Sequence, residues 1–276
     1  MSNDPAPSLD ALLPADMAAK AEAVGVAKAA LPLRRLVPLG VLAGSFIALG
    51  ACFSTVATVG VGNGGTLDPG MARVLGGVVF ALGLVLVVVS GAELFTGNTL
   101  IVIAAAGRKV TVPRLLRNWG VVFVANFVGA GATALLVEWS GRLDAGDGAL
   151  GTRAVAIATA KSSLGFGEAV ASGVLANALV CLAVWMTLSA RSLVDKVVVI
   201  VPPIAAFVAA GFEHSIANMY FFPVALFHGA DDLTWGGFLL DNLLPVTIGN
   251  IIGGAVLVGL VYWFVYLRPG TTGESR

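Results

Sequence analysis

The sequence predicts an all-α integral membrane protein whose six transmembrane helices form an inverted repeat of three plus three. Three observations predict this fold: long apolar runs, a low charge content, and short motifs that recur in the same order in both halves. The 276 residues are 58% hydrophobic and 12% charged, with a mean hydropathy of +0.93. Soluble domains carry roughly 25% charged residues, so this chain has too few charges to cover a water-facing surface.

Six apolar runs define the expected membrane domain. A helix needs about 20 apolar residues to cross the hydrocarbon core of a bilayer. The runs lie at about 36–60, 72–90, 119–137, 168–190, 197–227 and 243–267. We therefore expect one membrane domain over 36–267, an amphipathic N-terminal helix or tail over 1–35, and a C-terminal tail over 268–276. Residues 1–30 lack a signal-peptide pattern, so the first run should itself direct insertion.

The positive charges predict the topology. Twelve of the sixteen Lys and Arg residues fall on one side of the predicted spans, in the two tails and in the loops after spans 2 and 4. The opposite loops hold the other four: Arg73, Arg142, Arg153 and Lys161. Cytoplasmic loops carry an excess of Lys and Arg, so both termini are expected in the cytoplasm.

Three motifs recur between the two halves. They are GVLA at Gly40 and Gly173, G-x-E-x-x-x-x-N at Gly91 and Gly211, and N-x-x-G at Asn126 and Asn250. Their order predicts that a three-span unit has been duplicated. Because each unit has an odd number of spans, the second copy enters the membrane from the opposite side. Such inverted repeats are typical of channels and transporters.

The second motif also predicts where the helices are interrupted. Residues 91–98 and 211–218 place polar groups inside otherwise apolar stretches. Irregular backbone at membrane depth is tolerated only where protein or a water-lined cavity satisfies it. We expect spans 2 and 5 to be broken into half-helices that meet near a pore. The alternative is two intact helices with packing glycines.

Ionisable residues inside membrane spans are costly, so each is a candidate functional residue. Within the predicted spans these candidates are Glu93, Glu213 and His214. We interpret His214 as a proton or hydrogen-bond donor to an anion, against the alternative of a core histidine satisfied by carbonyl groups. The two glutamates are expected to fix the breaks by accepting hydrogen bonds. They could instead form an acid/base pair or bind a cation.

Three further residues of the breaks are candidates. Asn98 and Asn218 end the recurring motif and are expected to help fix the breaks. Thr96 can offer its hydroxyl to a passing solute, cap a half-helix over 99–106, or do both. His228 is expected in a solvated loop.

The sequence shows no metal-ligand set, no Ser/His/Asp arrangement, and no nucleotide or nucleic-acid signature. We expect no cofactor, no metal, no nucleic-acid partner and no enzymatic activity. Two competing hypotheses are a neutral-solute channel, of the water or ammonia kind, and an intramembrane enzyme built on the ionisable residues of the breaks. The enzyme hypothesis lacks an activated nucleophile.

Longer motifs resemble one known family. They are LLPADMAAKAEAVGVAKA (12–29), AELFTGNTLI (92–101), GVLANALVCLAVWM (173–186), GFEHSIANMYFFP (211–223) and PVTIGNIIGGAVLVGLVYW (245–263). With them the chain resembles the formate/nitrite transporter family over nearly its whole length. The resemblance implies aquaporin-like six-span protomers in the lipid bilayer of a bacterial-type inner membrane. It also implies a homo-oligomer, a pentamer in which each protomer has its own pore.

The resemblance further implies transport of small monovalent anions, with formate favoured and nitrite or hydrosulfide as alternatives. His214 would be the central histidine and Thr96 the threonine of the first break. Lys161 would draw anions into an outer vestibule, Asn177 would support the pore, and the helix near residues 14–30 would gate its cytoplasmic mouth. Hydrophobic constrictions on either side of the histidine would be formed by Phe80, Leu84, Leu94 and Phe207.

Overall fold

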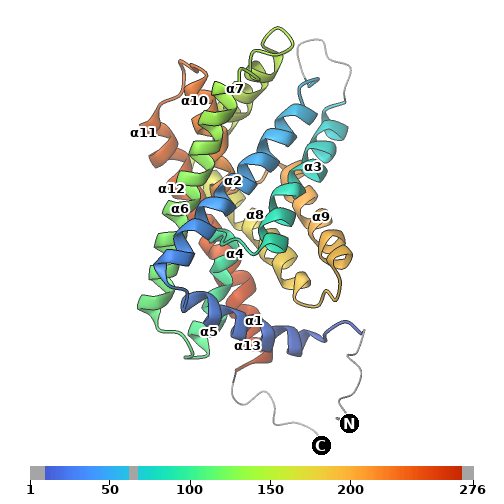
Figure 1. Ribbon diagram of the computed structural model, residues 1–276, viewed down its shortest axis with the longest axis vertical. Helices are drawn as coiled ribbons and strands as arrows, with labels where there is room; N and C mark the ends of the chain where they lie inside the picture. Colours follow the sequence, from blue (N-terminus) through green and yellow to red (C-terminus); the bar gives the residue numbers. More distant parts are fainter. Residues whose placement is uncertain (1–9, 62–67, 269–276) are drawn as a thin grey trace, which may run out of the picture.

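The structure is a computed structural model that describes residues 10–61 and 68–268. Within these residues helices are the only regular secondary structure, and both halves follow the same order of elements (Figure 1). The first half contains α1 (Pro14–Ala29), α2 (Leu33–Ala57), α3 (Pro69–Ser90), α4 (Phe95–Asn98), the 3₁₀ turn η1 (Thr99–Ile101), α5 (Val102–Ala106) and α6 (Val112–Trp139). The second half contains α7 (Ala149–Ser162), α8 (Phe166–Thr187), α9 (Leu193–Ala210), α10 (Ser215–Phe227), α11 (Trp235–Gly237), the π-helical η2 (Phe238–Leu243), α12 (Leu244–Ile251), the π-helical η3 (Ile252–Leu260) and α13 (Val261–Tyr266).

Six helical segments of the described chain are long and apolar enough to cross a membrane, which confirms the predicted number. They are Leu33–Ala57, Pro69–Ser90, Val112–Trp139, Phe166–Thr187, Leu193–Ala210 and Trp235–Tyr266. Helix α1 lies with α13 at one end of the bundle and α7 lies at the other, and we call these the α1 end and the α7 end (Figure 1). Helix α7, in the connection between spans 3 and 4, is an additional helix that the hydropathy pattern does not predict.

Both predicted breaks are present. Gly91 (φ 74°) and Gly211 (φ 78°) end α3 and α9 in the left-handed conformation that glycine adopts without steric cost. The chain then runs without helix over 91–94 and 211–214 before α4 and α10 begin. The interruptions are therefore shorter than the predicted 91–98 and 211–218. The apolar run at 197–227 consists of two helices, α9 and α10.

Glycines at equivalent positions bring the helices of each half into close contact. A Cβ on Gly129 of α6 would lie 1.9 Å from the carbonyl oxygen of Val41 on α2. A Cβ on Gly253 of η3 would lie 2.1 Å from the carbonyl oxygen of Val174 on α8. Small residues allow such backbone approach between membrane helices. The same crossing thus occurs in both halves, as the repeat predicts.

Candidate functional site

The two breaks meet through a hydrogen bond between His214 and Thr96. The His214 Nε2 atom lies 2.9 Å from the Thr96 Oγ1 atom, and both residues are buried. The other ring nitrogen, Nδ1, accepts from the backbone N–H of Ala217, so His214 caps the start of α10. Because a backbone amide can only donate, Nδ1 carries no hydrogen. The ring is therefore neutral, and its Nε2–H donates to Thr96.

The imidazole faces a small apolar chamber. This cavity of about 10 Å³ is lined by seven apolar side chains and His214. Its volume is near the lower limit for holding one water molecule. All four residues expected to form constrictions contribute to its wall: Phe80, Leu84, Leu94 and Phe207. The Phe80 and Phe207 rings meet edge to face at 5.7 Å between centroids.

A larger cavity of about 380 Å³ lies on the α7 side of this ring pair. Phe80, Phe207 and His214 line both cavities, so the two phenylalanines and the imidazole form the boundary between them. The larger cavity is also lined by Lys161 and Glu213. The Phe80–Phe207 contact and the His214 ring thus separate the larger cavity from the chamber.

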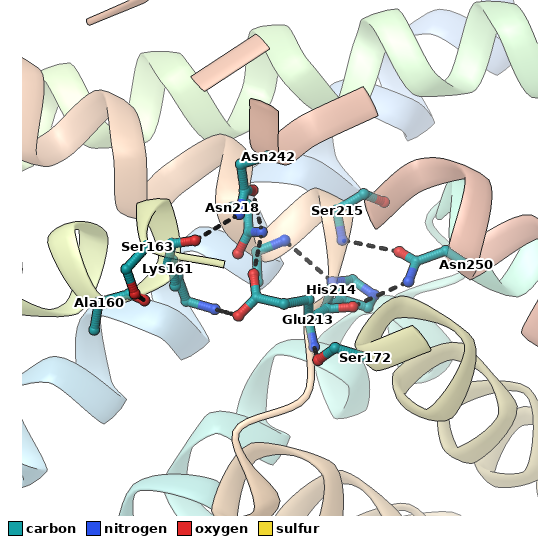
Figure 2. Close-up of polar contacts among 11 residues, drawn as sticks. Ala160, Lys161, Ser163, Ser172, Glu213, His214, Ser215, Asn218, Asn242 and Asn250 are labelled. Carbon is teal, nitrogen blue, oxygen red and sulfur yellow. Dashed lines mark hydrogen bonds and ion pairs between the residues drawn. The ribbon is translucent and has the colours of Figure 1, made fainter. Parts of the chain in front are cut away.

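The second break is held by a network around Glu213 (Figure 2). The Glu213 carboxylate accepts from Lys161 Nζ at 2.8 Å and from the Asn218 side-chain amide at 2.7 Å. Asn218 also donates to Asn242, and Asn242 donates to the carbonyl oxygen of Lys161. Lys161 was expected to attract anions as a vestibule cation. It does line the larger cavity, but its charge is paired with Glu213.

The first break is held by an equivalent network at the α1 end. Glu93 accepts from Lys28 Nζ at 2.7 Å and from the Asn98 amide at 2.8 Å. Asn98 donates to Asn118, and Asn118 donates to the carbonyl oxygen of Lys28. Both carboxylates are thus hydrogen-bonded at the breaks, as their structural interpretation requires.

Sequence reasoning missed three members of these networks. Lys28 and Lys161 are 133 residues apart, as are Gly40 and Gly173; Asn118 and Asn242 are 124 apart, as are Asn126 and Asn250. The offsets already found between the recurring motifs would therefore have identified Lys28, Asn118 and Asn242.

Asn126 and Asn250 satisfy the backbone that the breaks expose. Each side-chain oxygen accepts the first N–H of a half-helix, from Phe95 and Ser215 respectively, at 2.9 Å. Each side-chain amide donates to the carbonyl oxygen of the break glutamate of its own half. One amide side chain per half thus takes over hydrogen bonds that a continuous helix would make within itself.

Asn177 lies beside the junction of the two halves. Its amide donates to the carbonyl oxygens of Thr96 and Asn250 and to the Thr99 hydroxyl. The expectation that Thr96 caps a helix over 99–106 is wrong, because the half-helix begins at Phe95 and the Thr96 hydroxyl bonds to His214. His228 is also not a free loop residue, since its Nδ1 lies 3.1 Å from the Glu138 carboxylate.

The described residues contain no group of three or more His, Cys, Asp or Glu that could hold a metal ion. The site thus consists of one neutral imidazole in an apolar passage, with a carboxylate–ammonium pair at each break.

Comparison with known proteins agrees with this architecture. The profile of the formate/nitrite transporter family matches residues 15–264. The formate channel FocA of Escherichia coli K12 is 45% identical, with 94% of this chain and 96% of FocA covered. A probable formate transporter of Methanothermobacter thermautotrophicus is 39% identical, with 92% and 97% covered.

Solved structures show the same fold. A pentameric formate channel with formate bound superposes with a TM-score of 0.79 at 40% sequence identity, covering 86% of this chain and 98% of that one. An ion channel of the same family gives a TM-score of 0.79 at 31% identity, with 90% and 98% covered. The chain is a multi-pass membrane protein that belongs to the formate/nitrite transporter family.

Proposed function

We propose that this chain forms a transmembrane channel for small monovalent weak-acid anions, with formate as its main substrate. One observation carries the proposal. Of the eight residues that line the chamber, His214 alone is polar, and it lies with Phe80 and Phe207 at the boundary to the larger cavity. A solute at this boundary meets apolar walls and a single polar side chain. Relatives named as formate channels support formate over nitrite and hydrosulfide.

The passage favours a solute that can lose its charge. An ion without a partner in an apolar environment carries a large desolvation cost, whereas a small neutral acid does not. We infer that the anion takes a proton from the solution, crosses the aromatic contact as the neutral acid, and accepts a hydrogen bond from the His214 Nε2–H in place of the Thr96 hydroxyl. Transport should then be coupled to protons and should accelerate as the pH falls.

We also propose the orientation and assembly. The excess of Lys and Arg at the α1 end supports cytoplasmic termini in the inner membrane, so the α7 end and its cavity would face outward. The pentameric relative supports a pentamer with one pore in each protomer. We assign no catalytic role, because Glu93 and Glu213 are each paired with a lysine.

Stopped-flow swelling of proteoliposomes tests the proposal. Purified protein is reconstituted, and the vesicles are exposed in turn to formate, nitrite, hydrosulfide, glycerol and water. We expect rapid formate entry, slower nitrite and hydrosulfide entry, and glycerol flux equal to that of protein-free vesicles. Faster glycerol or water flux without formate flux would favour a neutral-solute channel and reject the proposal. Nitrite flux above formate flux would reject formate as the main substrate.

A further inference from the structure

The cavity at the α7 end carries an excess of positive charge. Its charged lining residues are Arg73, Arg153, Lys161 and Glu213. Three cations and one carboxylate give a net charge of +2 when His214 is neutral. Because Glu213 pairs with Lys161, the charges of the two arginines are left uncompensated. The part of the chain that the structure describes supplies no carboxylate within salt-bridge distance of either arginine.

Arg153 is held in a fixed orientation. Its Nε–H donates to the Thr58 hydroxyl at 3.1 Å, and that hydroxyl donates in turn to the carbonyl oxygen of Ser54. Thr58 and Ser54 are buried residues of the cavity wall at the end of α2. A guanidinium has five N–H donors, so four remain on the two terminal nitrogens. None of the four has a hydrogen-bond partner among the described residues.

The two arginines act on each other. Burial and, to a lesser extent, the positive charge of Arg73 lower the pKa of Arg153 below its usual value. Like charges held on one cavity wall repel each other, and an anion between them relieves the repulsion. The free edge of a guanidinium also matches the two oxygens of a carboxylate in a bidentate geometry.

We propose that Arg73 and Arg153 form an anion-binding subsite in the α7-end cavity, which holds a small monocarboxylate before it crosses the Phe80–Phe207 contact. The subsite rests on the proposed function and adds a loading step to it. It concentrates the anion beside the apolar passage, while the passage itself still limits the maximal rate. The arginines, and not the paired Lys161, then attract the anion into the cavity.

The test compares arginines at the same end of the protein. Arg153→Gln and Arg73→Gln each remove a cavity charge, while Arg142→Gln removes an exposed charge that does not line the cavity. Initial formate flux is measured against formate concentration in proteoliposomes. We expect the half-saturating concentration to rise roughly two- to fivefold for each cavity variant, as for removal of one partner of an accessible charge pair. The maximal rate of each cavity variant should equal that of the wild type. The Arg142→Gln variant should have the wild-type half-saturating concentration and maximal rate.

A second variant separates a built site from a diffuse field. Thr58→Val keeps every charge but removes the hydroxyl that orients Arg153, so it should also raise the half-saturating concentration.

The outcomes distinguish the two proposals. The subsite would be overturned if Arg142→Gln raised the half-saturating formate concentration as much as the cavity variants do. It would also be overturned if Thr58→Val left this concentration unchanged, because general surface charge would then explain the effect. If the protein conducts formate but the cavity variants keep the wild-type half-saturating concentration, the subsite is overturned and the proposed channel function stands. A wild-type protein without formate flux would overturn the proposed function itself.

Discussion

Lys28 on α1 and Lys161 on α7 make the same ion pair in opposite halves of the protein. Lys28 Nζ lies 2.7 Å from Glu93 Oε1, and Lys161 Nζ lies 2.8 Å from Glu213 Oε1. The repeat is therefore longer than the three spans that the motifs mark, because it includes the short helix before each first span. Each break is held from outside by a helix that does not itself cross the membrane domain.

The burial of these pairs predicts a stability effect. Lys161→Met leaves the Glu213 carboxylate, 3% exposed, without its counter-charge. Loss of one partner of a buried ion pair costs about 3 kcal/mol or more, so we expect a clear fall in the Tm of the detergent-solubilised protein. Lys28→Met should cost less, because the Lys28 side chain is 29% exposed and water can replace part of the interaction.

The double variant Lys161→Met/Glu213→Gln serves as the control for this prediction. It removes the unpaired charge while keeping a side chain that can accept from Asn218, so it should recover most of the lost Tm. A Lys161→Met protein as stable as the wild type would show that the ion pair contributes nothing to holding the second break.

The close crossing of α2 and α6 gives a second prediction. Gly129→Ala places a methyl group against the Val41 carbonyl, a backbone atom that a side-chain rotation cannot remove. Overpacking of this kind costs about 1–3 kcal/mol or more. Gly131→Ala, two residues further along α6, meets nothing within 4 Å. Thermal unfolding should show a lower Tm for Gly129→Ala only, and equal Tm values would contradict the crossing.

The sequence predicted the spans and breaks because hydropathy and glycine placement are local properties. These two properties do not reveal the partner of Glu93. Lys28 lies in a polar tail, where a lysine signals topology, and only folding of α1 against the first break brings it to a carboxylate 65 residues away. The known offset of 133 residues contained this information, but spacing alone does not reveal that a tail packs on a membrane domain.

The shared position of the two cavity arginines is likewise not predictable from the sequence. The sequence predicts Arg73 and Arg153 only as charges of the loops on the side opposite the two tails. Their common cavity arises because the start of α3, the end of α2 and the middle of α7 meet at one end of the bundle. Contacts between such distant segments leave no periodic pattern in a single sequence.

The aromatic contact predicts a change in selectivity. Phe207→Ala removes one ring of the Phe80–Phe207 pair and enlarges the passage to the chamber. We expect proteoliposomes with this variant to admit glycerol severalfold faster than the wild type. Phe166→Ala, at an exposed aromatic residue of α8, should leave glycerol flux unchanged. Glycerol exclusion in the Phe207→Ala protein, once its folding is verified, would place the size barrier elsewhere.

His214→Asn tests the central step of the proposed mechanism. Asn is a good N-cap residue, so its side-chain oxygen can still accept from the start of α10 where His214 Nδ1 now does. The variant should therefore fold, but it places no imidazole Nε2–H at the chamber. We expect formate flux to fall about two- to tenfold, the scale for loss of one hydrogen bond between neutral groups.

The dependence of formate flux on pH provides a second check on this mechanism. In the wild type, formate flux should rise as the pH falls, because more anion is protonated at the aromatic contact. With His214→Asn, flux should be lower at every pH while the rise with falling pH remains, since the proton comes from the solution and only the imidazole donor is lost. Flux recorded over a series of pH values in proteoliposomes with a fixed formate gradient checks both points. A variant with the wild-type flux at every pH would remove the imidazole from the transport step and leave the apolar passage as the sole determinant of flux.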